Sequence, residues 1–151
     1  MKKKLFAAAS LATALYLTGC ASVPTASVEE DSAKKAFNPP SEGLSGLYVY
    51  RNSNFGAALK KRVYVNDDYL GETAPMTYFY KEVAPGAVKL STSSEFGNND
   101  LMISTEEGKN YFVRQYIKLG VFVGGANLEL VSEEEGKKGV LECKLAETPN
   151  N

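Results

Sequence analysis

Few side chains in this chain of 151 residues could carry out chemistry. The sequence has no histidine and two cysteines, Cys20 and Cys143. Catalytic triads need a histidine to move a proton, and zinc clusters need several cysteine or histidine ligands. Composition therefore excludes both kinds of site. The remaining candidates for a functional site are the tyrosines, the arginines, serine paired with lysine, and the carboxylates.

Five tyrosines alternate with apolar residues, as in β-strands: Tyr48, Tyr50, Tyr64, Tyr78 and Tyr80. Residues two apart share one face of a strand, so we expect a sheet face lined by tyrosine. One interpretation is a platform for a glycan or a peptide, since tyrosine combines a rigid ring with a hydroxyl tip. The alternative, which we favour, is that this face lies beneath a helix or a second sheet and fills the core.

Arg51 and Arg114 lie beside aromatic residues. A guanidinium can bind a carboxylate or a phosphate of an anionic glycan or lipid through two hydrogen bonds. Stacking on tyrosine, or pairing with Glu72 or Glu82, is the commoner outcome. Arg51 and the five tyrosines form our set of candidate binding residues.

The remaining polar motifs do not predict a catalytic or a metal site. Calcium loops space their acids at alternate positions and add a bidentate glutamate, and neither 66–68 nor 98–100 does so. Ser32 and Lys35 have the spacing of a catalytic dyad, but they fall in a segment that we expect to be flexible. We predict no catalytic residue, no metal, no cofactor and no enzyme activity.

The N-terminus has the parts of an export signal, a basic start over Met1–Lys4 and an apolar stretch over Leu5–Leu17. The stretch is shorter than the roughly 20 residues that span a membrane, so a signal peptide is favoured over a permanent helix. The four residues that end this segment resemble the lipobox of bacterial lipoproteins: Leu17, Thr18, Gly19 and Cys20.

This resemblance implies that residues 1–19 are removed and that the thiol of Cys20 carries a diacylglyceryl group, with further acylation by chains such as palmitate. Two or more chains hold a protein stably on its membrane. Because Ala21 rather than aspartate follows Cys20, the resemblance implies the outer membrane of a Gram-negative host, facing the periplasm or the cell surface. The alternative is an ordinary secretory signal in which Cys20 is incidental.

Loss of Lys2, Lys3 and Lys4 with the signal leaves 14 basic and 18 acidic residues, a net charge of −4. Binding to nucleic acid needs a surplus of clustered lysine and arginine, so it is disfavoured. Residues 20–45 contain few large apolar side chains, and we expect them to form a lipidated N-terminus and flexible tether.

Residues 46–147 have the alternating pattern of an all-β domain, and residues 148–151 form a short tail. Short turns favour antiparallel pairing, so we predict a mainly β fold, an antiparallel β-sandwich. A short C-terminal helix would follow Ser132, although Gly136 and Gly139 weaken its first turn. The predicted strands are 47–51, 62–65, 69–73, 77–83, 87–91, 101–105, 111–118 and 127–131.

The glycine-interrupted stretch 117–131 has two interpretations. It could hold an apolar loop that meets a partner or a bilayer, or form two core strands joined by a glycine turn, which we favour. If Cys20 carries lipid, Cys143 has no disulfide partner within the chain, and we expect a buried side chain rather than an intermolecular link.

Several strand and turn motifs resemble a family of short bacterial lipoproteins that carry a domain of unknown function. They are Leu47-Tyr48-Val49-Tyr50-Arg51, Val63-Tyr64-Val65-Asn66-Asp67-Asp68-Tyr69-Leu70-Gly71-Glu72, Val83-Ala84-Pro85-Gly86 and Gly108-Lys109-Asn110-Tyr111-Phe112. The turn before Leu70-Gly71 and the later Pro85-Gly86 are also similar to PEGA-type modules, which are small β-sandwiches. The resemblance covers residues 46 to about 146 and implies fold and location, with no catalytic residue.

We therefore expect a lipid-anchored envelope lipoprotein whose domain is a non-catalytic binding or interaction module. Its partner would be an envelope protein or a glycan, bound on one sheet face or at the loops near Phe55 and Phe96. The alternatives are a hydrolase acting on envelope polymers and a purely structural envelope component. A concave site with converging polar groups would favour the hydrolase. The sequence leaves the ligand and the oligomeric state open.

Overall fold

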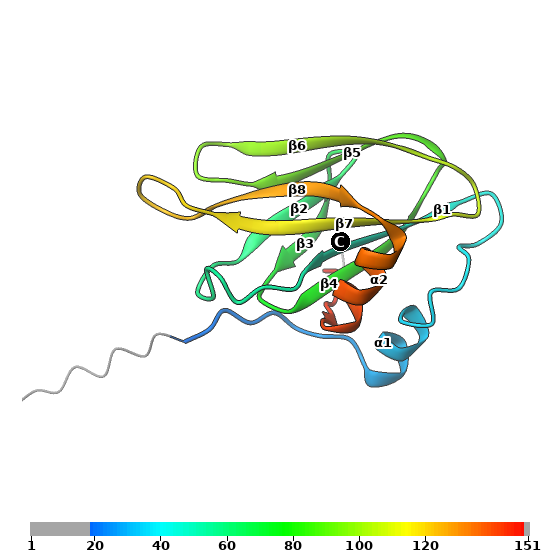
Figure 1. Cartoon of the computed structure of the whole chain (residues 1–151), viewed down its shortest axis with the longest axis horizontal. Coiled ribbons are helices and arrows are strands. Elements are labelled where there is room, and N and C mark those ends of the chain that lie inside the picture. The colour runs from blue at the N-terminus through cyan, green and yellow to red at the C-terminus, as the bar shows by residue number, and fades with distance from the viewer. Residues whose placement is uncertain (1–18, 150–151) are drawn as a thin grey trace, which may run out of the picture.

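The computed structural model describes residues 19–149. The predicted signal peptide up to Thr18, with Leu17, lies outside the described residues, as do the last two residues of the predicted tail. Within residues 19–149, no helix is long and apolar enough to cross a membrane. The fold is mainly β, with two sheets and with helices beside one of them (Figure 1).

All eight predicted strands are present, and a ninth, very short strand follows the C-terminal helix. The bounds are β1 Ser45–Arg51, β2 Lys61–Val65, β3 Asp68–Thr73, β4 Thr77–Val83, β5 Gly86–Ser93, β6 Asn98–Thr105, β7 Asn110–Lys118, β8 Gly125–Val131 and β9 Lys144–Leu145. The five-stranded sheet has the order β8-β7-β1-β4-β9, and the four-stranded sheet has the order β3-β2-β5-β6.

Two strand pairs differ from the predicted antiparallel arrangement. β1 pairs in parallel with β7, and β4 pairs in parallel with β9, whereas the other pairs are antiparallel. A short turn imposes antiparallel pairing only on strands that are consecutive in the sequence. β1 and β7 are separated by most of the domain, so their relative direction is not constrained by a turn.

The main core lies between the two sheets. Val49 and Phe79 of the five-stranded sheet belong to the same buried cluster as Val63 and Leu90 of the four-stranded sheet. All four side chains are at most 1% exposed. Because side chains alternate along a strand, the residues next to Val49 and Phe79 point to the opposite face of their sheet.

Helices α1 (Val28–Lys34) and α2 (Glu133–Leu141) cover that opposite face (Figure 1). α2 begins after Ser132 as predicted, and the Ser132 side chain accepts a hydrogen bond from the backbone N–H of Glu135 at 3.2 Å. The prediction of a C-terminal helix is confirmed.

The glycines of α2 strengthen the contact between helix and sheet, where we expected them to weaken the helix. A Cβ atom on Gly136 would lie 2.1 Å from Phe112 Cβ, and one on Gly139 would lie 2.2 Å from Tyr50 Cε2. Both glycines therefore allow the helix backbone to approach the aromatic side chains of β1 and β7 closely.

The predicted flexible tether over 20–45 differs from the structure from Ala21 onward. The N–H of Ala21 donates to the carbonyl of Ala57 at 2.7 Å, and Thr25 forms an isolated β-bridge with Ala146 beside β9. Ser27 and Glu30 then form a capping box that begins α1. The segment has few large apolar side chains, but the ring of Phe37 packs against that of Tyr48, and backbone hydrogen bonds at the sheet edge and the capped helix also hold the segment on the domain.

Candidate functional site

Three of the five candidate tyrosines are buried beneath the helices. Tyr48, Tyr50 and Tyr78 are at most 1% exposed, and the ring of Tyr48 stacks on that of Phe112 at 5.0 Å. The Tyr48 hydroxyl donates to the carbonyl of Lys34, which ends α1, at 2.8 Å. A ligand on the surface cannot reach these side chains. They fill the layer between the sheet and the helices, as the alternative interpretation of the sequence stated.

Tyr80 is half-buried and lines a cavity with a volume of about 500 Å³. The Lys34 ammonium lies 4.3 Å from the centre of its ring, and its hydroxyl donates to Glu82 at 3.0 Å. Glu30, a carboxylate on this cavity, accepts the N–H of Ser27 in the capping box. These polar groups are engaged in holding α1, so we find no free acid and base pair among them.

Arg51 is completely buried and holds a loop rather than a ligand. Its Nη1 donates to the carbonyl of Leu59 at 2.7 Å, and its Nη2 donates to the carbonyls of Gly56 at 2.8 Å and Phe55 at 3.2 Å. Desolvation by burial lowers the pKa of the guanidinium. Arg51 therefore fixes the loop 52–60, and an anionic ligand has no access to it.

Arg114 is committed to ion pairs on the surface. It pairs with Glu129 of β8 and, at 3.1 Å, with Glu135 of α2. These partners differ from the expected Glu72 and Glu82, because the antiparallel pairing of β7 with β8 places Arg114 directly opposite Glu129. The pairs link α2 to the sheet.

Tyr64 is the candidate residue that lies on a sheet face left uncovered by the described helices (Figure 1). It is directly opposite Tyr69 in the β2–β3 hairpin, and the two ring centres are 5.6 Å apart. The side chain of Arg62, two residues along the strand, is 62% exposed and lies 3.8 Å from Glu72. Aromatic rings beside an exposed guanidinium can hold a planar or sugar-like group together with an anion.

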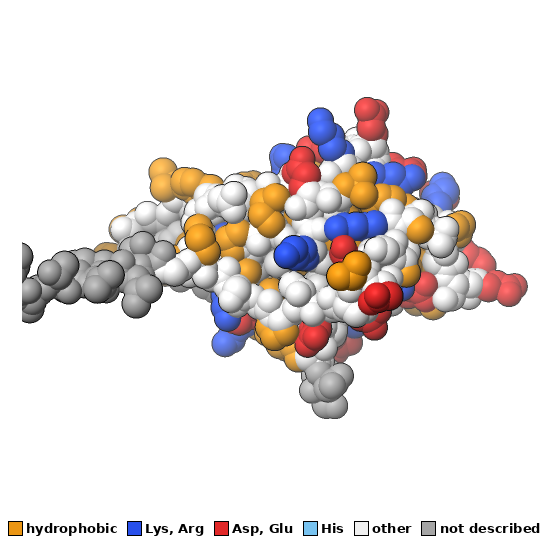
Figure 2. All heavy atoms as spheres, turned by 90° about the horizontal axis from the view of Figure 1, so that it is seen from below, with side chains coloured by type: hydrophobic (Ala, Val, Ile, Leu, Met, Phe, Trp, Pro, Cys, Tyr) orange, Lys and Arg blue, Asp and Glu red, His pale blue; other side chains and the backbone are white. Residues whose placement is uncertain are grey.

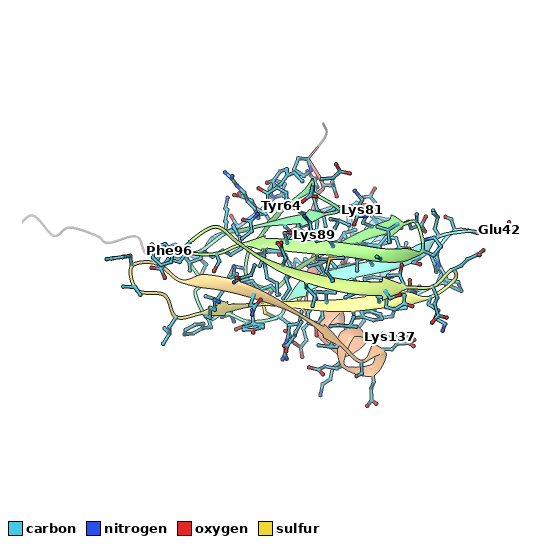
Figure 3. The ribbon with its side chains drawn as sticks, turned by 90° about the horizontal axis from the view of Figure 1, so that it is seen from above. Glu42, Tyr64, Lys81, Lys89, Phe96 and Lys137 are labelled. Carbon is cyan, nitrogen blue, oxygen red and sulfur yellow. The ribbon has the colours of Figure 1, made fainter. Side chains whose placement is uncertain are left out.

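Two residues of the neighbouring strands complete this surface. Lys89 of β5 is opposite Met102 of β6, and the Lys89 ammonium pairs with Asp67 at 2.5 Å. We call the surface the open face and define it by Arg62, Tyr64, Tyr69, Lys89 and Met102. Figure 3 shows Tyr64 and Lys89 close together on the four-stranded sheet.

Tyr69 and Arg62 were not singled out from the sequence, although a signal for them is present. The hairpin between β2 and β3 turns at Asn66 and Asp67, which have positive φ angles of 51° and 69°. Asparagine and aspartate tolerate this conformation. Counting outward from such a turn places Tyr64 and Tyr69 on the same side of the hairpin.

The two oxygen-rich turns make contacts within the fold. Asn66 Oδ1 accepts the N–H of Lys89 at 3.0 Å, and Asn99 Nδ2 donates to the carbonyl of Ala126 at 2.7 Å. Among residues 19–149, no group of three or more His, Cys, Asp or Glu could hold a metal ion. The turns therefore position strands.

The two cysteines have opposite environments. Cys20 is exposed, and the next residue, Ala21, is already hydrogen-bonded to the domain. Cys143 is 2% exposed beneath the helices, with its Sγ 3.6 Å from the carbonyl of Arg51. Burial raises the pKa of the Cys143 thiol to about 12. Only the Cys20 thiol is accessible to a modifying enzyme.

Comparison with known proteins gives a family but no activity. The profile of the family described as "Protein of unknown function (DUF2846)" matches residues 41–126. A protein of Haemophilus influenzae (strain ATCC 51907 / DSM 11121 / KW20 / Rd), described as "Uncharacterized protein", is 58% identical over 145 residues, which are 95% of this chain and 86% of that relative. No solved structure matches the chain significantly. The similarity to PEGA-type modules stays a prediction.

Proposed function

The chain belongs to the family described as "Protein of unknown function (DUF2846)", and we propose that it is a lipid-anchored protein of the bacterial cell envelope whose domain is a non-catalytic binding module. The observation that carries the proposal is the placement of Cys20. It ends a lipobox-like motif, Leu17-Thr18-Gly19-Cys20, and its thiol is exposed immediately before the folded domain begins.

The surroundings of Cys20 suit acylation. An acyltransferase and a peptidase must close around the backbone at this position, and an added Cβ on Gly19 would meet no atom within 4 Å. Cys143 is a poor acyl acceptor, because its thiol is buried and its raised pKa keeps it protonated. The two cysteines therefore provide a matched pair of variants.

Metabolic labelling with radioactive palmitate tests the anchor. The unaltered chain and the Cys143→Ala variant should both take up label and sediment with membranes. The Cys20→Ala variant should lose the label. Equal labelling of the Cys20→Ala variant and the unaltered chain would refute acylation at this thiol.

The binding function is supported by the open face. Tyrosine and arginine are enriched at interfaces because each contributes contact area together with hydrogen bonds. Here two tyrosine rings pair beside Arg62, and Lys89 lies on the neighbouring strand. Such a surface suits an anionic glycan or an acidic peptide of the envelope.

Site-specific photocrosslinking in living cells tests this surface. A photoreactive residue at position 64 should give a discrete crosslinked product, whereas the same residue at Leu141, an exposed position on α2, should give none. The Arg62→Ala variant should weaken the product at position 64. Identical products from both positions, or none from position 64, would contradict binding at the open face and favour a structural envelope component.

A further inference from the structure

Three loops at one end of the sandwich carry exposed apolar side chains. They are the loop 52–60 between β1 and β2, the loop 94–97 between β5 and β6, and the loop 119–124 between β7 and β8. Six of their large apolar side chains are 54–85% exposed. We call this surface the apolar tip, and it consists of Phe55, Phe96, Leu119, Val121, Phe122 and Val123.

Contacts beneath the apolar tip hold the loops together. Phe55 and Leu59 share a pocket of about 290 Å³ with Leu119, Phe122 and Val123, so the first and third loops adjoin. Phe96 shares a neighbouring pocket with Val121. In Figure 1 the loops before β6 and β8 lie at the left, where the described chain begins, and Figure 2 shows orange side chains gathered at this end.

Several polar groups at the base of the tip bind backbone groups of its loops. Glu95 accepts the backbone N–H groups of Val121 at 2.7 Å and Phe122 at 2.5 Å. Lys61 Nζ donates to the carbonyl of Gly124 at 2.5 Å, and Arg51 binds three carbonyls of the loop 52–60. A backbone group without a hydrogen bond costs free energy in an apolar medium. These contacts therefore lower the free-energy cost of moving the tip from water into a bilayer.

The start of the described chain identifies the occupant of this surface. Ala21 is hydrogen-bonded to Ala57, in the same loop as Phe55. One residue spans at most about 3.6 Å, so lipid on Cys20 enters a membrane close to the loop 52–60, at the same end of the molecule as the tip. Lys60 and Lys118 are exposed beside the tip. Lysine at a membrane surface is attracted to anionic head groups, even though the chain that begins at Cys20 has a net charge of −4.

We propose that the apolar tip inserts into the head-group and upper acyl region of the bilayer that holds Cys20. The domain is then attached at two adjoining points and stands on the membrane, with Glu42 at the far end and the open face directed sideways. Figure 3 shows Phe96 and Glu42 at opposite ends of the molecule. The inference rests on the proposed lipid anchor.

A fluorescent depth probe tests the insertion. The full chain, purified from membranes, carries the dye NBD on Phe122→Cys and is placed as one copy per nanodisc of phosphatidylethanolamine and phosphatidylglycerol. Reduction by aqueous dithionite should be slowed at least about tenfold relative to the dye on Glu42→Cys, with blue-shifted emission. A dye on Leu141→Cys, which replaces an exposed apolar residue on α2, should react as fast as the dye at position 42. Cys143 is buried and does not compete for the dye.

Mass spectrometry of the same preparation separates the possible failures. Equal dithionite rates at positions 122 and 42, with acylated Cys20, would overturn tip insertion and leave the anchor intact. The dye at position 122 could also be protected from dithionite in crowded vesicles but not in single-copy nanodiscs. That result would overturn tip insertion and show that the tip binds a second copy of the chain. An uncleaved chain with a free Cys20 thiol would refute the anchor. Protection of the dye at position 122 in that chain would indicate that residues 1–19, and not the bilayer, cover the tip.

Discussion

The side chains with the most perturbed chemistry in this molecule are the buried tyrosines. Burial raises the pKa of Tyr48 and Tyr50 to about 12, and burial with a contact to Asp31 raises the pKa of Tyr78. Active sites commonly contain such shifts, but structural burial produces them too. Here each phenol lies between a sheet and a helix, so the pKa shifts result from burial in the packed core.

These shifts predict the alkaline stability of the protein. A phenol that stays neutral in the folded state ionises near its ordinary pKa of about 10 once the chain unfolds. The free energy of unfolding should therefore fall as pH rises from about 10 to about 12. Tyrosinate absorbance, followed with and without denaturant, measures this. In Tyr48→Phe, one fewer tyrosine should ionise late. Ionisation of every tyrosine of the folded chain near pH 10 would contradict the burial.

The alternation of side chains every two residues correctly predicted which tyrosines of β1 and β4 share a face, because this alternation is a local property of a strand. The same pattern could not separate Tyr64 from the others. Its strand belongs to the second sheet, and sheet membership depends on pairing between distant segments. The open face was therefore only partly predictable.

At the scale of elements, α2 depends on its glycines. Gly136→Ala should destabilise the protein by about 1–3 kcal/mol, because overpacking against Phe112 outweighs a gain in helix propensity of about 1 kcal/mol. Lys138→Ala, at an exposed position of the same helix, should change stability by less than about 0.5 kcal/mol. Urea unfolding measures both variants. A stabilised Gly136→Ala variant would show that the helix does not lie this close to the sheet.

Helix α1 is held on the domain by Asp31. Its carboxylate accepts the N–H of Leu145 at 2.9 Å and pairs with Lys35 at 2.8 Å. Burial raises the pKa of Asp31, but these hydrogen bonds outweigh it and hold the pKa below its usual 3.8. The resulting stabilisation is present above pH 3.8 and is lost as pH falls through the lower, folded-state pKa.

Asp31→Asn should therefore lower the free energy of unfolding by roughly 1–3 kcal/mol near neutral pH, and by much less in strong acid. Glu29→Gln, an exposed change in the first turn of α1, is the matched control. Limited proteolysis within residues 21–45 should accelerate in the Asp31 variant alone. Rapid cleavage within residues 21–45 of the unaltered chain would instead support the flexible tether that the composition predicted.

The eight strands were predictable from local runs of β-branched and aromatic residues between turns. The apolar pattern around residues 29–37 allows a turn of helix there but does not require α1, although Ser27 and Glu30 have the spacing of a capping box, because the surrounding composition favoured disorder. β9 has two residues, too few to show a pattern. The parallel pairing of β1 with β7 depends on the whole domain, which local sequence does not encode.

At the scale of the whole molecule, the surfaces of the domain differ in what covers them. Helices cover one outer sheet face, the open face remains accessible, and the apolar tip adjoins the start of the described chain (Figure 1). Since residues 21–45 pack on the domain, an anchor at Cys20 would hold it against the membrane with little freedom to move away. Such an anchor would bring the apolar tip to the membrane surface.

The central claim is that Cys20 carries the lipid that fixes this protein to a membrane. Mass spectrometry of the N-terminal peptide, released from native membranes, tests it most directly. The account predicts a peptide that begins at Cys20 and carries a diacylglyceryl group and an additional acyl chain. A peptide with an unmodified Cys20 thiol, whether cleaved before it or continuous with Gly19, would contradict the account.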